Sequence, residues 1–384
     1  MSNEPKTAVL HVACHPVTGP WSVMRDLARA QAESGRYSSV GIGVIVDPSW
    51  PADYRDEIRK TGMPFYESSC PALFGTAAFL YQRLRPPPWK AWLSHFAEQA
   101  GTARVVVHLH NAWLSGVFLP LPSIEGIRVG VVATFHGVNE HFKGKPVRKA
   151  IHRWMAGRLL KYGAKLTSVD GANTALAERI LGIPRSAFAV VPNGVHPVSI
   201  VKSERPRCPL VIGHVGSMIP QKGWQLVAQA AELLNRDAIH VRVVLAGRGS
   251  DDAEAGNWAA AHSGWAEYLG FMEKPRERVM PQLDVLCLMS QWEGFPMAIV
   301  EAMSVGLPTI ATDVGGVSEA VRDGETGLLI PRTAEALAEA VSALIHDRVR
   351  LTQMGERALA RFGEKFTMNR IVERYAKVYD GAVS

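Results

Sequence analysis

Short apolar runs alternate with segments of helical periodicity along most of the chain. The apolar runs predict β-strands at residues 8–13, 40–46, 105–110, 130–136, 166–169, 189–195, 210–216, 240–246, 267–272, 285–289, 308–311 and 328–330. Apolar side chains that recur every third or fourth residue predict helices at 22–33, 171–181, 224–234, 297–305, 334–347 and 366–379. Strands that alternate with helices are typical of α/β domains built on a parallel sheet.

The length of 384 residues is sufficient for two domains with complete hydrophobic cores. The order of the elements predicts a first Rossmann-like domain at residues 1–195 and a second at 209–365. Residues 196–208 are rich in Pro, Ser and charged side chains and form the predicted linker. Residues 366–384 carry the last helix.

The most informative stretch runs from Ser290 to Glu319. Pro296 suits the first position of a helix, residues 297–305 have helix-forming composition, and Gly306 suits the stop. A strand precedes this loop and helix, and another strand follows them. The amides at such a helix start bind anions with the support of the helix dipole, so Met297 and Ala298 are predicted to bind a phosphate.

Two carboxylates flank this helix start. Glu293 lies in the loop, and Glu301 lies eight residues further on, about two helical turns along. If a nucleotide diphosphate occupies the helix start, Glu293 reaches the sugar beyond the phosphates and Glu301 reaches the ribose hydroxyls. Two exposed acids on an amphipathic helix are the alternative interpretation.

The pattern E-G-F-P-x4-E-A-M-x2-G-x-P-x2-A-T-D-V-G-G, which starts at Glu293, resembles the donor-site signature of the retaining glycosyltransferase family 4. The resemblance implies the GT-B fold: two Rossmann-like domains with parallel sheets that face each other across a cleft, and a C-terminal helix that packs on the first domain. It also implies a nucleotide-sugar donor, UDP- or GDP-linked, as substrate, with no cofactor and no metal.

Other segments resemble the same family. Gly216 and Lys222-Gly223 match its G-R-x4-K-G loop, in which Arg and Lys neutralise the diphosphate, but Ser217 stands at the Arg position. Arg248 is a candidate to supply the missing charge. The donor-binding residues expected from the resemblance are Gly19, Ser217, Lys222, Arg248, Phe271, Glu293, Gly294, Phe295, Pro296, Met297, Ala298 and Glu301.

Two histidines end predicted strands of the first domain. His110 closes the strand at 105–110, and His136 closes the next one. Ligands of open α/β sheets bind at the carboxyl ends of strands, so both histidines are well placed. His136 also resembles the active-site histidine of the family, near the transferred sugar, and His110 is a candidate acceptor contact.

The segment from 141 to 165 is strongly basic. Ile151, Met155 and Leu159 recur at helical spacing and leave bases on the other face. A solvated helix face is one interpretation. The other is that Lys143, Lys145 and Lys149 are acceptor contacts, with bases beside Trp154 and Leu159 holding an anionic lipid at a membrane surface.

Charge and cysteine content limit the partners and the compartment. Residues 1–195 hold 22 Lys+Arg and 13 Asp+Glu, a balance of +9, and the rest of the chain has −3. No apolar run approaches the ~20 residues of a membrane span, and the first residues do not resemble a signal peptide. We therefore expect a cytoplasmic protein, at most peripheral on the inner face of the plasma membrane, that binds no nucleic acid. Isolated cysteines favour buried free thiols over a disulfide framework or a zinc site.

Together these features predict a retaining, metal-independent hexosyltransferase. It moves a sugar from a nucleotide-diphosphate sugar to a hydroxyl of a glycan or lipid-linked saccharide, in cell-surface polysaccharide or glycolipid assembly. His136, Glu293 and Lys222 are its candidate catalytic residues. A nucleotide-sugar epimerase or hydrolase of the same fold, and a non-catalytic nucleotide-sugar-binding protein, are the alternatives.

Overall fold

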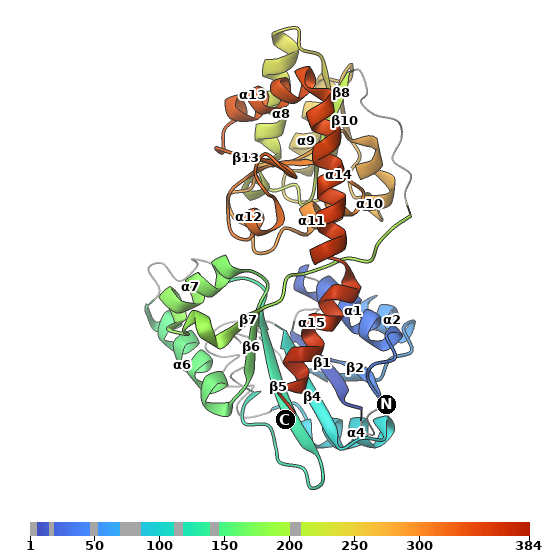
Figure 1. Cartoon of the computed structure of the whole chain (residues 1–384), viewed down its shortest axis with the longest axis vertical. Coiled ribbons are helices and arrows are strands. Elements are labelled where there is room, and N and C mark those ends of the chain that lie inside the picture. The colour runs from blue at the N-terminus through green and yellow to red at the C-terminus, as the bar shows by residue number, and fades with distance from the viewer. Residues whose placement is uncertain are drawn as a thin grey trace. The chain divides into compact units, whose positions relative to one another are not determined.

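The computed structural model describes residues 6–14, 19–46, 53–69, 86–110, 118–138, 146–199 and 209–384. The chain divides into two compact units. Unit 1 comprises residues 1–193 together with 368–384, and unit 2 comprises residues 194–367. The last helix in sequence therefore belongs to the unit formed by the beginning of the chain, as the GT-B expectation requires (Figure 1).

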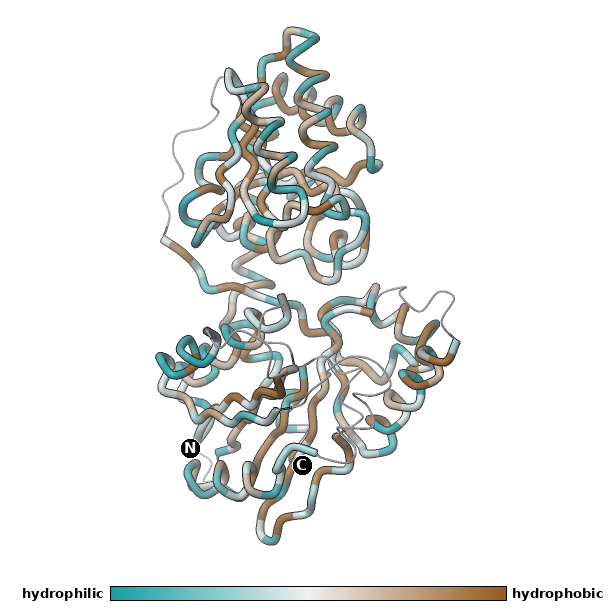
Figure 2. The backbone as a smooth tube through the Cα atoms, turned by 180° about the vertical axis from the view of Figure 1, so that it is seen from behind, coloured by the Kyte–Doolittle hydropathy of each residue, from teal (hydrophilic) through white to brown (hydrophobic). Residues whose placement is uncertain are grey.

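Unit 1 is built on a seven-stranded parallel sheet in the order β3-β2-β1-β4-β5-β6-β7. Its strands are β1 (Ala8–Cys14), β2 (Val40–Val46), β3 (Phe65–Ser69), β4 (Arg104–His110), β5 (Arg128–Phe135), β6 (Lys165–Ser168) and β7 (Phe188–Val190). Apolar side chains, most often Val, fill β1, β2, β4 and β5 because these strands are buried on both faces. Figure 2 shows the same strands as brown, hydrophobic stretches of the backbone.

Helices cover both faces of this sheet. They are α1 (Gly19–Glu33), α2 (Asp53–Arg59), α4 (Trp89–Ala100), α6 (Pro146–Tyr162), α7 (Gly171–Leu181) and α15 (Met368–Asp380), with a short 3-10 turn at Arg185–Ala187. α4, α6 and α7 pack on one face through one continuous apolar cluster. α1 and α15 share the other face, where Leu27 and Ile371 lie in one cluster with Val9 and Val132.

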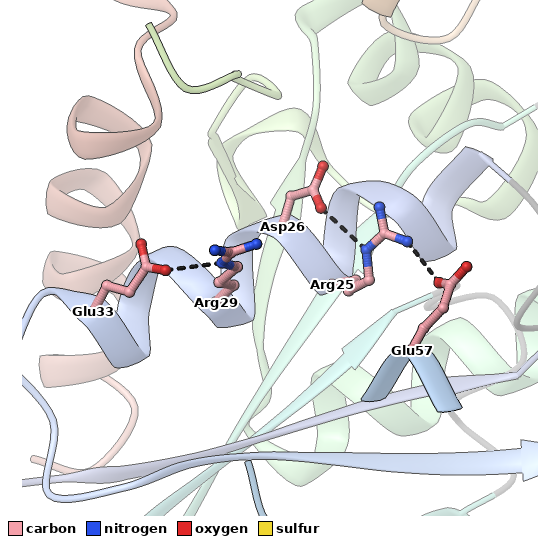
Figure 3. Close-up of polar contacts among 5 residues, drawn as sticks. All are labelled: Arg25, Asp26, Arg29, Glu33 and Glu57. Atoms are coloured by element: carbon pink, nitrogen blue, oxygen red, sulfur yellow. Dashed lines mark hydrogen bonds and ion pairs between the residues drawn. The ribbon is translucent and has the colours of Figure 1, made fainter. Parts of the chain in front are cut away.

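Ion pairs on the surface of unit 1 join α1 to α2. Arg25 donates to Asp26 on its own helix and to Glu57 on α2 (2.7 Å), while Arg29 pairs with Glu33 one turn along α1 (Figure 3). These side chains are between a third and two thirds exposed. Pairs of this kind contribute about 0–1 kcal/mol each, so they orient α2 without deciding the fold.

Unit 2 repeats the architecture with a six-stranded parallel sheet in the order β10-β9-β8-β11-β12-β13. Its strands are β8 (Leu210–Val215), β9 (Val241–Ala246), β10 (Ala266–Tyr268), β11 (Val285–Leu288), β12 (Thr309–Thr312) and β13 (Gly327–Ile330). Its helices are α8 (Trp224–Arg236), α9 (Asp252–Ala261), α10 (Pro275–Arg278), α11 (Met297–Ser304), α12 (Val317–Ala320), α13 (Ala334–His346) and α14 (Arg348–Lys365), with 3-10 turns at Pro220–Lys222 and Met280–Gln282.

In each sheet, later strands lie on both sides of the strand that comes first in sequence, so the strand order changes direction there. The reversal lies between β1 and β4 in unit 1 and between β8 and β11 in unit 2. The carboxyl ends of strands that flank such a point are the usual ligand site of an open α/β sheet. The loops after β8 and β11 therefore meet where a ligand of unit 2 is expected to bind.

The predicted α/β class with two Rossmann-like domains is confirmed, and several boundaries need correction. α1 begins at Gly19 rather than at residue 22, so Gly19 is the first helical residue and not a loop residue. Pro296 is the N-cap of α11, not its first residue, and that helix ends at Ser304. The last helix spans Met368–Asp380, and α14 was not predicted.

Two further features bear on the sequence-based expectations. Cys287 is a buried free thiol, and burial raises its pKa to about 12, as expected for an inert core cysteine. Cys70 and Cys208 lie outside the described residues. Within the described parts of the chain, no helix combines the length and the apolar character that crossing a bilayer requires.

Candidate functional site

The start of α11 exposes backbone donors beside the carboxyl end of β11. Pro296 caps the helix, and its carbonyl accepts from the amides of Ile299 and Val300. Met297 and Ala298 are the first two helical residues, and helix geometry leaves their N–H groups without an acceptor inside the helix. These are the two amides that the sequence singled out for an anion.

Glu293 forms a close ion pair with Lys222 in the loop before α11. The Lys222 ammonium lies 2.7 Å from Oε1 and 2.8 Å from Oε2 of Glu293, which is 71 residues away in sequence. Ser290 also donates to Oε1 at 2.6 Å. The Glu293 side chain is only 8% exposed and that of Lys222 is 26% exposed, so the pair is shielded but reachable from one side.

The two loops that carry this pair are fastened to each other. The amide of Gln291 donates to the carbonyl of Gln221 at 2.7 Å, and the Arg332 guanidinium donates to carbonyls of both loops. Gly223 has φ +72°, and a Cβ there would lie 2.0 Å from the carbonyl oxygen of Met289. Only glycine permits this approach, which places Lys222 next to Glu293.

A second close approach supports Glu293 from the side of β12. Gly315 has φ +56°, and a Cβ there would lie 1.9 Å from the carbonyl oxygen of Glu293. The amide of Gly316 donates to the carbonyl of Gly294 at 3.0 Å, and Thr312 donates to the carbonyl of Ser290. The Gly-Gly pair of the sequence motif thus braces the backbone on both sides of the carboxylate.

Arg248 and Phe271 form the other predicted part of the site, after β9 and β10. The Arg248 guanidinium lies 5.6 Å from the centre of the Phe271 ring, which is 62% exposed. The amide of Met218 donates to the carbonyl of Arg248, so this loop is joined to the one that holds Ser217. An exposed ring beside a cation can stack with a planar base.

Other residues of the predicted donor set have different surroundings. Phe295 is 6% exposed and its ring packs on Phe366 at 5.7 Å, and Pro296 is buried. Only the backbone of these two residues is available to a ligand. Glu301 lies half-buried on α11, as its spacing from Glu293 indicated. Ser217 is exposed, and its short side chain carries no charge.

In unit 1, His136 follows directly after β5 and is half-buried. Its Nε2 lies 2.9 Å from Nδ1 of His110. Burial lowers the pKa of His136 to about 4, so its ring is neutral near pH 7.

The role of His110 as an acceptor contact stays a prediction. His110 is 3% exposed, and its two ring nitrogens lie at hydrogen-bond distance from His11 and His136. The ring therefore contacts other histidines on both sides in this structure.

The basic segment is only partly described. Lys143 and Lys145 lie outside the described residues, and Lys149 is half-buried on α6. Leu159 is fully buried, as its place in the apolar stripe predicted, so it cannot lie beside the bases at a membrane surface; the exposed apolar neighbour is Leu160, at 39%. The exposed face of α6 also carries Val147, Arg153, Trp154 and Lys161.

Four residues of the site region were not predicted. Ser290 and Arg332 contact the Lys222–Glu293 loops through pairings distant in sequence. His11 and His108 are buried beside His110, in register on neighbouring strands. A signal for the histidines was present, because the alternation in His108-Leu-His110 points both side chains of β4 to one face.

Models of known families match almost the whole chain. The description "Glycosyl transferase 4-like domain" matches residues 18–194, and "Glycosyl transferases group 1" matches residues 198–361. The second match contains Lys222, Glu293 and Glu301 in their order. The chain belongs to glycosyltransferase family 4.

Individual glycosyltransferases are similar to parts of the chain. The D-inositol 3-phosphate glycosyltransferase of Nocardia farcinica is 38% identical over 181 residues, which are 43% of this chain and 40% of that relative. The phosphatidyl-myo-inositol mannosyltransferase of Mycobacterium leprae is 28% identical over 71% of this chain and 73% of its own length. The chain thus matches less than half of the length of the Nocardia relative.

Solved structures of other proteins share the fold. The Anabaena protein HepE, crystallised with UDP, has a TM-score of 0.73 at 19% identity, over 98% of this chain and 100% of HepE. At this identity the likeness establishes the GT-B fold alone.

Proposed function

We propose that the protein is a retaining glycosyltransferase that moves a sugar from a nucleotide-diphosphate sugar to a hydroxyl acceptor. The observation that carries this proposal is the Lys222–Glu293 pair beside the start of α11. The pair brings one positive and one negative group to the carboxyl ends of β8 and β11, where the strand order reverses. The Lys222 ammonium can neutralise charge on a diphosphate, and the Glu293 carboxylate can accept hydrogen bonds from sugar hydroxyls.

Lys222 can bind a diphosphate without releasing Glu293. An ammonium has three N–H donors, and two of them are directed at the Glu293 oxygens. The third remains for a phosphate oxygen, together with the amides of Met297 and Ala298 and the positive end of the α11 dipole. These groups would stabilise the negative charge that develops on the leaving diphosphate.

The transfer itself exchanges one bond at the anomeric carbon of the sugar. The bond from this carbon to the diphosphate oxygen breaks, and the acceptor oxygen bonds to the same face of the sugar. The acceptor proton passes to the departing diphosphate, so no protein nucleophile is required. Since Lys222 and the helix start supply the positive charge, the reaction proceeds without a divalent metal in this proposal.

Glu293 and Glu301 hold the two ends of the donor in this account. Glu293 accepts from sugar hydroxyls, because a carboxylate has about four lone-pair sites and three are used by Lys222 and Ser290. Glu301 lies four residues after the first residue of α11, about 6 Å along the helix axis, and accepts from the ribose hydroxyls. Arg248 and Phe271 face the base and the outer phosphate.

The relatives support the classes of donor and acceptor. HepE was crystallised with UDP and with UDP-glucose, which supports a UDP- or GDP-linked sugar here. The relative from Mycobacterium leprae is named for a phosphatidylinositol acceptor, which supports a lipid-linked or glycan acceptor. We place the reaction in assembly of cell-surface polysaccharide or glycolipid, on the cytoplasmic side of the membrane.

Thermal unfolding in chelator, with UDP, GDP, ADP and their sugar conjugates, tests the proposal. A ligand that binds the folded state raises the melting temperature by mass action. We expect one nucleotide-sugar series to stabilise the wild type. The response should be lost in Lys222→Met and kept in the matched control Lys365→Met, on the exposed end of α14. Absence of stabilisation by every nucleotide, or an unchanged response in Lys222→Met, would contradict it.

A further inference from the structure

Four buried or half-buried side chains form a hydrogen-bonded line in unit 1. Gln31 Oε1 lies 2.7 Å from His11 Nε2, His11 Nδ1 lies 3.0 Å from His110 Nε2, and His110 Nδ1 lies 2.9 Å from His136 Nε2. Gln31 and His11 are fully buried, and His110 is 3% exposed. Only His136, at the end of the line, is reached by solvent.

The sheet explains how residues distant in sequence meet in this way. β1, β4 and β5 are neighbours, and His11, His110 and His136 come from these strands or directly follow them. Val9 and Val106, two residues along from His11 and His108, lie in the cluster under α1 and α15, so alternation puts the histidines on the same face. The line crosses the carboxyl-end half of the sheet at its point of reversal.

The amide oxygen at one end fixes the direction of every hydrogen bond. It can only accept, so His11 carries its proton on Nε2 and its Nδ1 accepts from His110. By the same argument His110 Nδ1 accepts from Nε2–H of His136. Burial lowers the pKa of His11 and His136 to about 4 and that of His110 well below its usual value, so the three rings are neutral near pH 7.

The Gln31 amide also begins a second hydrogen-bonded line. Its Nε2 donates to the Tyr379 hydroxyl at 3.2 Å, and this hydroxyl donates to His108 Nδ1 at 2.7 Å. His108 Nε2 then donates to Thr134 at 2.6 Å, and Thr134 lies 2.6 Å from Thr167. Because Tyr379 belongs to α15, the last helix of the chain contacts the first line through Gln31.

We propose that Gln31, His11 and His110 are positioning residues for His136. They hold it as the Nε2–H tautomer, with Nδ1 as a hydrogen-bond acceptor for a sugar or acceptor hydroxyl. Among the described residues Nδ1 of His136 has no hydrogen-bond partner, so the lone pair is available to a ligand. The inference rests on the proposed function for the identity of that hydroxyl.

A metal site is the competing explanation of the cluster. Ring nitrogens of His11, His108 and His110 lie within 4.8 Å of one another, close enough to hold an ion. Each ring nitrogen of these three residues, however, is already at hydrogen-bond distance from a protein group. A metal would have to break both lines, so the hydrogen-bonded network accounts better for the cluster.

Two-bond proton–nitrogen NMR correlations of the free protein, labelled with ¹⁵N-histidine, test the proposal. The His136 signals are assigned by their loss in His136→Gln. We expect one Nε2–H tautomer in the wild type and in Gln31→Glu, which keeps an oxygen acceptor for His11. In Gln31→Leu the tautomers of His136 should mix. The matched control Thr167→Val shortens the second line only and should keep the wild-type pattern.

Two results would overturn the proposal. One is an Nδ1–H tautomer, or a mixture of tautomers, at His136 in the wild type. This result does not depend on whether any variant folds. The other is an unchanged His136 tautomer in folded Gln31→Leu. No nucleotide is present in this experiment, so it tests the positioning of His136 separately from the proposed function. If His136 has the Nε2–H tautomer but the protein binds no nucleotide sugar, the proposed function fails and the positioning of His136 stands. With a donor identified, Gln31→Leu should lower kcat more than it raises KM.

Discussion

At the scale of single residues, the site depends on pairings that local sequence does not reveal. Lys222, Glu293 and His136 were singled out by their place at strand ends and loops together with the resemblance to family motifs. These features could not show that Lys222 and Glu293 are bonded to each other, because 71 residues separate them and only the adjacency of β8 and β11 joins them. His11 and His108 were missed for the same reason, since their partners lie on neighbouring strands and on α1 and α15.

The two carboxylates of the α11 region should have separable effects. Glu301→Ala should weaken binding of the bare nucleoside diphosphate by about tenfold, about 1.4 kcal/mol, because it removes the ribose contact. Glu293→Gln keeps the size of the side chain and should lower turnover by about 10²-fold or more, with nucleotide affinity nearly unchanged. Calorimetric titration and turnover separate the two, and equal affinity losses in both variants would refute these roles.

Gly315 should be far more sensitive to substitution than a glycine of similar conformation elsewhere. Gly315→Ala brings a Cβ to 1.9 Å from the Glu293 carbonyl oxygen, so the carboxylate loop must move. Gly324 has φ +73° with open space around it, and Gly324→Ala should cost only about 1–2 kcal/mol. We expect a loss of about 3 kcal/mol or more at Gly315, measured by urea unfolding. Equal losses at the two positions would contradict the bracing role.

At the scale of elements, apolar runs were reliable guides where both sheet faces are buried. The strands β1, β2, β4 and β8 were predicted to within a residue or two, since Val, Ile and Leu fill them. α14 was not predicted because its sequence is mostly polar, with a narrow apolar stripe of Leu351, Met354 and Phe362 toward the core. The start of α1 was missed because Gly19 and Pro20 favour a loop locally.

The exposed face of α6 gives the membrane hypothesis a testable form. Val147 is 71% exposed, Trp154 is 42% exposed, and Arg158 lies 4.8 Å from the Trp154 ring. Apolar and basic side chains on one face suit an anionic lipid surface, where each base contributes about 1 kcal/mol. We expect salt-sensitive binding to phosphatidylserine-containing vesicles, weakened at least tenfold when Lys149, Arg158 and Lys161 are changed to Glu.

The matched control for this experiment reverses three exposed bases of α14, Arg350, Arg357 and Lys365. It makes the same change of net charge on a face with less aromatic character. Nucleotide affinity should be intact in both triple variants. If vesicles do not bind the wild type at low salt, or if the two triple variants weaken binding alike, α6 is not a membrane contact.

At the scale of the whole molecule, two units of the same architecture share one acid-sensitive feature. Each has neutral histidine buried in its sheet, such as His11 in unit 1 and His214 in unit 2. Burial lowers the pKa of both rings from 6.5 to about 4. The composition of 47% hydrophobic residues predicted full cores, but it could not reveal which polar side chains those cores contain.

The free energy of unfolding should therefore fall as the pH drops from 6.5 toward 4. Above pH 6.5 these rings are neutral in both states, and below it only the unfolded state takes up the protons. A pKa lowered from 6.5 to about 4 corresponds to a loss on the order of 3 kcal/mol per residue once the pH is near 4. Urea unfolding across this range should be steeply pH-dependent. His214→Gln should flatten the response, and exposed His240→Gln should not; a flat wild-type profile would contradict the assignment.

The most direct test of the central claim is the configuration of the sugar that the protein releases. The donor that stabilises the protein is incubated with it in chelator, with water as the acceptor, and the first-formed anomer is identified by proton NMR. We predict slow release of nucleoside diphosphate with retention of the donor's anomeric configuration, abolished in Lys222→Met and kept in Lys365→Met. An inverted first product, or release that requires added Mg²⁺ or Mn²⁺, would contradict the account.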